Sequence, residues 1–462
     1  MFTLNRRQFL ATSSAFAGMS ASKGLANTQP TKLIAQESDV QLLPGDYGKT
    51  TLWCFGGRSP GPEIRVTQGD RVRRRLVNRF SQGTSTHWHG IRIDNAMDGV
   101  SGLTQDAVQN GDKFDYDFKV PDAGTYWYHA HNRSLEQVAR GLYGALIVDE
   151  PESLDIDREE VLILDDWRID PETAQISNDF GAPRDLSHAG RLGNLITTNG
   201  TFNLALTARQ NERLRLRLIN ASNARNFQLG LDGLEGWMIA LDGMPLRSPR
   251  RVLETMILAP AQRIDLIVDV TADVGETAHL VQIGREEAFS QVAFEVASRG
   301  SVTRRNAPVS LPPNDHPMVD LKEATKLSLS MEGGAMGRLS AASLGGEVKP
   351  MGELVQAGYF WSFNGAVDGI DGDPFARLER GENVKLTIVN DTAFPHAMHL
   401  HGMHFHEVEE SGALGPLRDT TLLERGQTRE IAFVADNPGR WLLHCHMLSH
   451  AASGMMTKIV VS

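Results

Sequence analysis

Histidine is the residue type most suited to chemistry in this chain, because most of its copies lie in four short segments. Ten of the 15 histidines fall in these segments. Each segment contains a His-x-His pair, and residues i and i+2 of a strand point to the same side of it. Four pairs at matched positions can therefore present eight imidazoles to a metal cluster, although one pair alone would more simply be a hydrogen-bonded surface pair. The pairs are His87 and His89, His129 and His131, His399 and His401, and His444 and His446.

One of these pairs encloses a cysteine. Cys445 stands between His444 and His446 and, as the middle residue of the three, points to the opposite side of the strand. A metal on its thiolate would thus be joined to the histidine cluster through one residue. Two imidazoles, a thiolate and a distant thioether form a blue-copper centre, whereas zinc would leave the thioether and the other eight histidines without a role. The candidate partners of the cysteine are His396, His450 and Met455.

An internal repeat organises the chain. Three segments each contain a short strand, a polar turn and a second strand that ends in asparagine. In the second copy leucine alternates with arginine from Leu214 to Leu218, which predicts a half-buried strand. Repetition of such a unit predicts three related β-domains. The segments are residues 62–78, 204–220 and 375–390.

The repeat also predicts which domains contain the chemistry. Nine residues after the terminal asparagine, the first and third copies have His87 and His399, whereas the second has Leu229. We therefore expect the first and third domains to share the cluster and the second to bind no metal. Many short strands with Gly and Pro turns favour an all-β chain of three Greek-key β-sandwiches over one large β-domain. We place the domains at 40–150, 151–300 and 318–462, with a proline-rich linker at 300–317.

Composition excludes several classes of function. The chain has 46 basic and 57 acidic residues, and this net charge of −11 does not suit a protein whose main partner is nucleic acid. Beyond the leader no run of about 18 apolar residues occurs, so we expect no membrane span. Two cysteines allow at most one disulfide. If Cys445 binds a metal, Cys54 is expected to be a buried free thiol.

Residues 1–28 are expected to be an export signal. Arg6 and Arg7 precede a weakly apolar stretch from Phe9 to Met19, which is followed by small residues. This arrangement resembles a bacterial twin-arginine signal, which directs folded proteins out of the cytoplasm. A disordered leader with an accidental arginine pair is the alternative. The resemblance implies recognition by the twin-arginine export machinery and a location in the periplasm.

The histidine motifs resemble the four copper signatures of bacterial laccase-like multicopper oxidases. They read His-Trp-His-Gly from His87, His-Ala-His from His129, His-x-x-His-Leu-His-Gly from His396, and His-Cys-His-x-x-x-His-x-x-x-Gly-Met from His444. The resemblance implies three cupredoxin-like domains and four copper ions, with a trinuclear cluster between the first and third domains. It implies that a type 1 copper is bound by His396, Cys445, His450 and axial Met455. It assigns a type 2 copper to His87 and His399, one type 3 copper to His89, His129 and His446, and the other to His131, His401 and His444.

The same resemblance implies one-electron oxidation of a donor at the type 1 copper and four-electron reduction of O2 to water at the cluster. Asp98 matches a proton-donating carboxylate of the family, or else is an ordinary turn residue; Ala451 stands where relatives often have a second acid. The donor is a small molecule or a metal ion. We expect phenols or diamines, because the methionine-rich insert of cuprous oxidases is reduced to Met331, Met336 and Met351. The alternatives are a cuprous oxidase for copper tolerance and a copper-binding protein without turnover.

Overall fold

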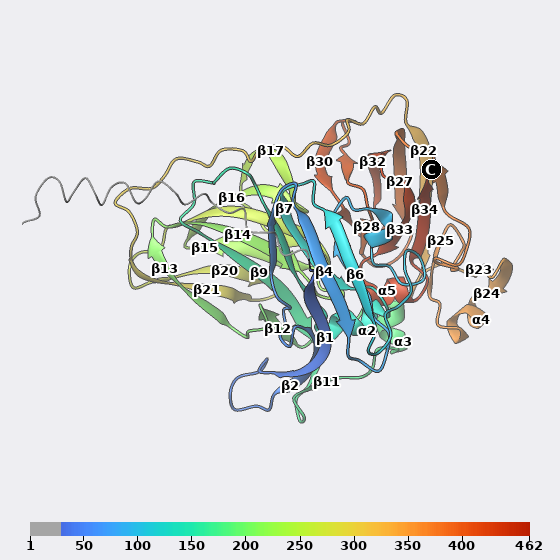
Figure 1. Ribbon diagram of the computed structural model, residues 1–462, viewed down its shortest axis with the longest axis horizontal. Helices are drawn as coiled ribbons and strands as arrows, with labels where there is room; N and C mark the ends of the chain where they lie inside the picture. The colour runs from blue at the N-terminus through green and yellow to red at the C-terminus, as the bar shows by residue number, and fades with distance from the viewer. Residues whose placement is uncertain (1–28) are drawn as a thin grey trace, which may run out of the picture.

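Strands dominate the computed structural model, which describes residues 29–462 (Figure 1). Three β-sandwiches follow one another along the chain, so the all-β prediction is confirmed. The predicted domain boundaries stay a prediction. The export signal predicted for residues 1–28 lies outside the described residues. Within the described part, no helix has the length and apolar character that a bilayer crossing requires.

Sandwich 1 consists of two four-stranded sheets, each mainly antiparallel with one parallel pair. The parallel pairs, β1 with β4 and β3 with β8, show that the chain crosses over between strands rather than running as a simple meander. One sheet contains β2 (Thr50–Phe55), β1 (Thr31–Val40), β4 (Arg71–Asn78) and β6 (Lys113–Lys119). The other contains β3 (Ile64–Thr67), β8 (Tyr143–Asp149), β7 (Gly124–Ala130) and β5 (Thr86–His89).

Sandwiches 2 and 3 each combine a six-stranded with a five-stranded sheet. Sandwich 2 contains β12 (Leu195–Thr198), β9 (Arg158–Trp167), β14 (Arg213–Asn220), β19 (Arg263–Val270), β16 (Leu234–Leu241) and β17 (Met244–Arg251), and then β13 (Leu204–Gln210), β21 (Ala288–Arg299), β20 (Thr277–Ile283), β15 (Phe227–Asp232) and β18 (Met256–Leu258). Sandwich 3 contains β25 (Trp361–Phe363), β22 (Thr325–Gly333), β27 (Glu382–Asn390), β32 (Thr428–Ala435), β29 (Phe405–Val408) and β30 (Leu414–Arg418), and then β26 (Ala376–Leu378), β34 (Met456–Val461), β33 (Gly439–Cys445), β28 (His396–Leu400) and β31 (Thr420–Leu423).

Short helices and hairpins lie in the connections between strands within the sandwiches. The helices are η1 (Asn95–Met97), α2 (Ser134–Ala139), α3 (Pro183–Ser187), α4 (Met351–Gln356) and α5 (Leu448–Ala452), and two small hairpins are formed by β10 (Ile169–Asp170) with β11 (Gln175–Ile176) and by β23 (Ala341–Leu344) with β24 (Glu347–Pro350). Neither a helix nor a strand occurs in the described chain between Arg299 and Thr325. This proline-rich segment is bound to sandwich 1 by Asn314, whose side chain exchanges two hydrogen bonds with the backbone of Ala123.

The repeated asparagines have the same structural task in all three sandwiches. The side-chain amide of Asn220 donates to the carbonyls of Arg225 and Leu258 at 2.8 Å, and its oxygen accepts from the amide of Ser222. Asn78 and Asn390 make the equivalent set of bonds. Each asparagine thus satisfies buried backbone groups where a strand ends, which explains why the repeat ends in this residue.

The three sandwiches do not each have a separate hydrophobic core. Sandwiches 1 and 3 share one apolar cluster, in which Trp88 and Phe118 belong to the same core as Leu400 and Trp441. Most of sandwich 2 has a core of its own. A continuous core fixes sandwich 1 against sandwich 3, and the histidine motifs lie on strands of these two.

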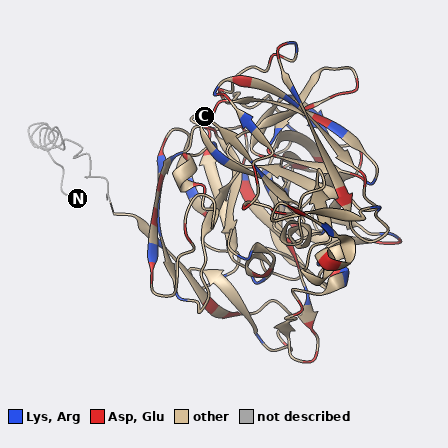
Figure 2. Cartoon of the chain, turned by 90° about the vertical axis from the view of Figure 1, so that its right-hand side faces the viewer, with Lys and Arg blue, Asp and Glu red and all other residues tan. Residues whose placement is uncertain are grey.

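The prediction of a half-buried strand in sandwich 2 is wrong. Its leucines face the core, but the arginines on the opposite face of β14 are buried as well, with at most 2% of each residue exposed. Arg215 binds Glu150 of sandwich 1 at 2.8 Å and Asp265 at 2.7 Å, and Arg217 binds Glu159 at 2.7 Å. Paired carboxylates make it possible to bury these cations where two sandwiches meet. Elsewhere, basic and acidic residues are interspersed along the chain (Figure 2).

Candidate metal centres

Two pairs of neighbouring strands position the eight paired histidines. In sandwich 1, β5 and β7 are antiparallel, with His87 opposite His129; in sandwich 3, β28 and β33 are antiparallel, with His399 opposite His444. The second members of three pairs follow directly after these strands. All eight residues are at most 7% exposed. The structure therefore brings the four predicted pairs into one buried cluster between sandwiches 1 and 3.

The ring nitrogens of the cluster converge in groups. Nε2 of His129 lies 3.4 Å from Nδ1 of His89 and 3.4 Å from Nε2 of His446. Nε2 of His401 lies 3.2 Å from Nε2 of His444, and these two residues form a second group with His131, in which the ligand atoms lie within 4.8 Å of one another. These groups contain the two triplets that the family resemblance implies.

The remaining pair of the prediction also faces the cluster. His87 and His399 belong, with His401, to a third group of close ligand atoms, and the ring centroids of His87 and His399 are 5.9 Å apart. Nε2 of His87, His131 and His399 has no hydrogen-bond partner among the described residues, although each is buried. Such atoms are costly in a protein interior unless something binds them.

Two aspartates determine which ring nitrogen of His87 and His399 keeps a free lone pair. Nδ1 of His87 donates to the backbone oxygen of Asp98 at 2.8 Å, and Nδ1 of His399 donates to the backbone oxygen of Asp419 at 2.8 Å. Since a carbonyl oxygen only accepts, each ring must carry its proton on Nδ1 and leave Nε2 as a lone pair.

Each carboxylate of these aspartates then contacts a histidine of the opposite sandwich. Asp98 lies 3.0 Å from Nδ1 of His401, and Asp419 lies 3.2 Å from Nε2 of His89. The ring nitrogen that faces the cluster is therefore Nε2 in His401 and Nδ1 in His89. Outer hydrogen bonds of this kind orient metal-binding imidazoles and raise their basicity.

A second site surrounds the cysteine. Sγ of Cys445 lies 3.6 Å from Nδ1 of His396 and 3.7 Å from Nδ1 of His450, and the two nitrogens are 3.0 Å apart. Nε2 of His450 donates to the carbonyl of His188 at 2.7 Å, and the hydroxyl of Thr392 lies 2.8 Å from Nε2 of His396. Met455 is fully buried, and its carbonyl accepts from the amide of Cys445 at 3.0 Å. His396, Cys445 and His450 therefore lie together, with both Nδ1 atoms turned toward the thiol, and the buried Met455 is next to them through its backbone.

Burial controls the ionisation of both sites. It lowers the pKa of His131 to about 3 and that of His450 to about 4, so these imidazoles are neutral at physiological pH and able to bind a metal. Burial raises the pKa of the Cys445 thiol to about 12, so a metal must displace its proton. Burial also acts to raise the pKa of Asp419, but Arg263 and the adjacent histidines hold it well below its usual range.

The donor sets fit copper. One site combines a thiol, two imidazoles and a buried methionine, and the other contains only imidazoles, some of them with unpartnered inward nitrogens. Both sets match the preference of copper for soft sulfur and for imidazole. Cys54 is a separate buried free thiol, as predicted.

Several residues of the sites could not be found by motif spacing. Asp419 follows His399 by 20 residues, whereas Asp98 follows His87 by 11, so counting along the repeat does not align them. The carbonyl of His188 and the guanidinium of Arg263 come from sandwich 2, which has no histidine motif. No local pattern marks a backbone oxygen as a partner of a distant ring.

Comparison with known proteins agrees with this geometry. Three family models described as multicopper oxidase match residues 36–153, 158–293 and 349–462. Multicopper oxidase MmcO of Mycobacterium tuberculosis (strain ATCC 25618 / H37Rv) is 30% identical over 97% of this chain and 92% of its own length. The Copper resistance protein A homolog of Pseudomonas syringae pv. tomato (strain ATCC BAA-871 / DC3000) is 28% identical, covering 99% of both. A crystal structure of a multi-copper oxidase from Pseudomonas thermotolerans has 34% identity and a TM-score of 0.82, with 94% of this chain and 99% of that chain covered.

A buried histidine cluster shared by two cupredoxin-like sandwiches defines a class of copper-dependent oxidoreductases. The chain belongs to the multicopper oxidase family, as the sequence motifs predict. It is an enzyme that binds copper and couples the oxidation of an electron donor to the reduction of O2.

The buried histidines predict that acid destabilises the copper-free protein. Burial lowers the pKa of His404 to about 3 and that of His316 to about 4. Below pH 6.5 the unfolded chain binds protons that the folded chain does not, so the free energy of unfolding falls by about 1.4 kcal/mol per pH unit for each such histidine. Urea unfolding between pH 6 and pH 4.5 measures how the free energy of unfolding changes with pH. In His404→Gln the slope of this dependence should be smaller by the equivalent of about one proton. A slope equal to that of the wild type would contradict the buried neutral state of His404.

Proposed function

We propose that this chain is a laccase-like multicopper oxidase with one type 1, one type 2 and two type 3 copper ions. His396, Cys445, His450 and the weak axial ligand Met455 would hold the type 1 copper. His87 and His399 would hold the type 2 copper; His89, His129 and His446 one type 3 copper; and His131, His401 and His444 the other. The observation that carries the proposal is the juxtaposition of the two sites, since Cys445 of one is directly bonded to His444 and His446 of the other.

Copper at these sites would supply one-electron chemistry at the thiolate and four-electron reduction of O2 at the cluster. Reduction of one O2 to two water molecules requires four electrons and four protons. The chain contributes the shortest covalent connection that two adjacent sites can have. Cys445 ends β33 and points toward His396 and His450, while its neighbours His444 and His446 point toward the cluster. The connection is fully buried, which excludes water from the route between the two sites.

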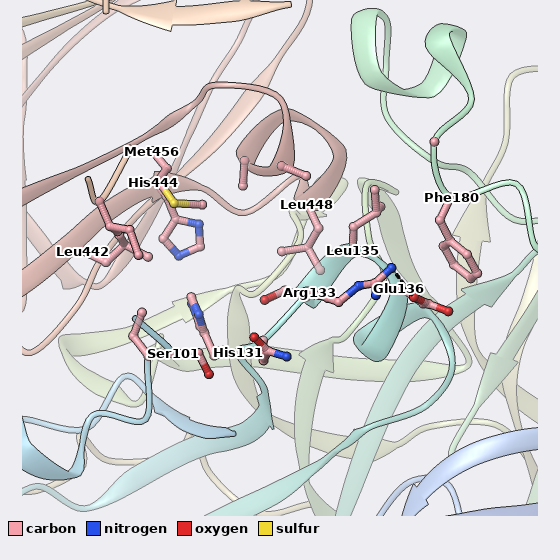
Figure 3. Close-up of a pocket in the computed structure, with 17 residues that line it drawn as sticks. Ser101, His131, Arg133, Leu135, Glu136, Phe180, Leu442, His444, Leu448 and Met456 are labelled. Carbon is pink, nitrogen blue, oxygen red and sulfur yellow. Dashed lines mark ion pairs between the residues drawn. The ribbon is translucent and has the colours of Figure 1, made fainter. Parts of the chain in front are cut away.

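A cavity gives O2 a route to the cluster. It has a volume of 470 Å³, and His131 and His444 form part of its wall (Figure 3). Figure 3 shows both imidazoles turned into the cavity near Ser101, with Leu442, Leu448 and Met456 around them. The mainly apolar wall suits an uncharged diatomic molecule. Arg133 and Glu136, which pair at 3.4 Å, line the same cavity farther from the rings.

Asp98 is the candidate proton donor. Its carboxylate is fully buried beside His401 at 3.0 Å and His87 at 3.2 Å. Asp419 has a similar position but is bound by Arg263, which holds it as an anion. Asp98 has no arginine or lysine partner among the described ion pairs, and its contacts there are with imidazoles of the cluster.

Phenols and diamines are the donors that we favour. Of the three methionines that could replace a methionine-rich insert, Met331 is fully buried and only Met336 is largely exposed, at 77%. A single exposed thioether is a weak site for cuprous ions. Oxidation of Cu(I) is the second candidate, favoured by similarity over nearly the full length to the Copper resistance protein A homolog. Oxygen uptake with a panel of Cu(I), Fe(II), phenols and bilirubin-like pigments tests the choice; copper bound without O2 uptake for any donor would leave a binding protein.

Export to the periplasm by the twin-arginine route is part of the proposal. Its support is the sequence from Arg6 to Met19. Replacement of Arg6 and Arg7 by lysine should leave the protein in the cytoplasmic fraction, measured by cell fractionation and immunoblotting. Unchanged periplasmic recovery of that variant would exclude the twin-arginine route.

The thiolate of Cys445 predicts a clear spectroscopic result. Cys445→Ser should abolish the blue absorption and most donor oxidation, because serine cannot supply the soft ligand of a blue centre. Visible absorption and oxygen uptake of the copper-loaded protein are the measurements. Cys54→Ser is the matched control, since Cys54 is the other buried thiol and packs in a different apolar cluster from Cys445. Blue absorption retained in Cys445→Ser, or lost in Cys54→Ser, would refute the assignment.

The position of Asp98 predicts a defect confined to O2 reduction. Asp98→Asn should slow reoxidation by O2 about 10²-fold, the usual effect of losing a positioned acid, while anaerobic reduction of the blue centre by donor keeps its rate. Stopped-flow absorption separates the two steps. Asp94→Asn is the control, because Asp94 precedes the same short helix η1 but faces solvent. Equal slowing of both steps would point to a structural role instead.

A further inference from the structure

Sandwich 2 contributes no histidine to the cluster, yet one of its arginines reaches it. Arg263 begins β19 and is fully buried where the three sandwiches meet. Resting on the copper sites proposed above, we infer that Arg263 is a positioning residue of the histidine cluster, which acts through Asp419 on His89 and His399. Sandwich 2 thereby has a function in the metal centre that its sequence motif does not reveal.

Every N–H group of the guanidinium has an acceptor. Nε donates to the carbonyl of Thr125 at 3.1 Å, in sandwich 1, and the terminal nitrogens donate to the carbonyls of Ala261 at 3.1 Å and Asp242 at 2.9 Å, in sandwich 2. The two remaining bonds go to both oxygens of Asp419 at 2.8 and 2.5 Å, in sandwich 3. A guanidinium has five N–H donors in a fixed plane, so this arrangement leaves it no freedom to turn.

The arginine therefore fixes the carboxylate that it binds. Oδ1 of Asp419 accepts from Arg263, from the hydroxyl of Thr420 at 2.8 Å and from Nε2 of His89 at 3.2 Å. The backbone oxygen of Asp419 accepts from Nδ1 of His399 at 2.8 Å. Two imidazoles that belong to different sandwiches, and whose rings stack at 3.7 Å, thus depend on one aspartate.

The contact between Arg263 and Asp419 requires a glycine beside it. A Cβ on Gly90 would lie 2.3 Å from Nη2 of Arg263 and 2.5 Å from Oδ2 of Asp419, and the residue has φ +86°, a conformation that favours glycine. The glycine that ends the His-Trp-His-Gly motif is thus needed for the ion pair to pass behind His89. The motif and the arginine, more than 170 residues apart in the sequence, form one structural unit.

Loss of the guanidinium has a specific expected effect. Without it, the buried carboxylate of Asp419 loses the two donors that fix it, and it becomes free to rotate or to shift away from the imidazoles. In either case the bond that keeps Nε2 of His89 protonated, and Nδ1 available, is weakened. Outer partners of metal-binding histidines typically contribute 10- to 100-fold in metal affinity. The thiolate site has no contact with Arg263 or Asp419 and should not change.

The experiment compares Arg263→Met with Arg213→Met. Arg213 is the matched control, because it is also buried, lies on the adjacent strand β14 and binds Asp269 of β19 at 2.6 Å, at the opposite end of the β14–β19 register from Arg263. Copper is titrated against a chelator, and the blue absorption and the type 2 electron paramagnetic resonance signal are recorded. Arg263→Met should lose about 10-fold or more in copper affinity of the cluster and change the type 2 signal, with the blue centre retained. Arg213→Met should retain all three readouts.

Other outcomes decide against the inference. If Arg263→Met keeps the affinity and the type 2 signal, or if both variants lose the blue centre in parallel, Arg263 is not a positioning residue. If Arg263→Met yields no folded protein, Arg263→Lys is tested, since lysine keeps the charge but cannot bind both oxygens of Asp419; an unchanged type 2 signal then overturns the inference. A wild-type protein without cluster copper would instead refute the proposed function.

Discussion

The structure depends on two aspartates, each of which binds one histidine of its own sandwich and one histidine of the other. Asp98 of sandwich 1 accepts from its own His87 and holds His401 of sandwich 3, while Asp419 of sandwich 3 accepts from its own His399 and holds His89 of sandwich 1. Each sandwich therefore orients one imidazole of the other as well as one of its own. The shared apolar core supplies the cohesion that this arrangement requires, because it fixes the two sandwiches at a single relative position.

The two aspartates have similar contacts with histidines but different charged neighbours. Asp419 is bound by Arg263 and is held as an anion, whereas Asp98 is surrounded by imidazoles. The two aspartates therefore differ in their charged partners: Asp419 has an arginine, and the described ion pairs of Asp98 are with imidazoles. Sandwich 2, which has Leu229 where the other two have histidine, supplies the arginine that distinguishes the two aspartates.

Sequence patterns predicted most of the fold and nearly all of the candidate ligands. The His-x-His spacing works because strand geometry alone places both rings on one side, and the repeat identifies Leu229 as the lost position. The patterns failed at β14, where alternation suggested a solvent face, but carboxylates of sandwich 2 itself and Glu150 of sandwich 1 cover this face. They also missed Asp419 and the carbonyl of His188, because contacts across domains depend on how sandwiches pack and leave no local spacing.

The burial of the cluster has a consequence for maturation of the protein. Half of its imidazoles lie beyond residue 398, so a nascent chain contains no complete centre until synthesis is almost finished. Afterwards the closed sandwiches leave the cavity at His131 and His444 as the described opening beside the rings. A complete set of cluster ligands therefore exists only once the last strands have been synthesised, and in the folded chain the cavity at His131 and His444 lies beside these ligands.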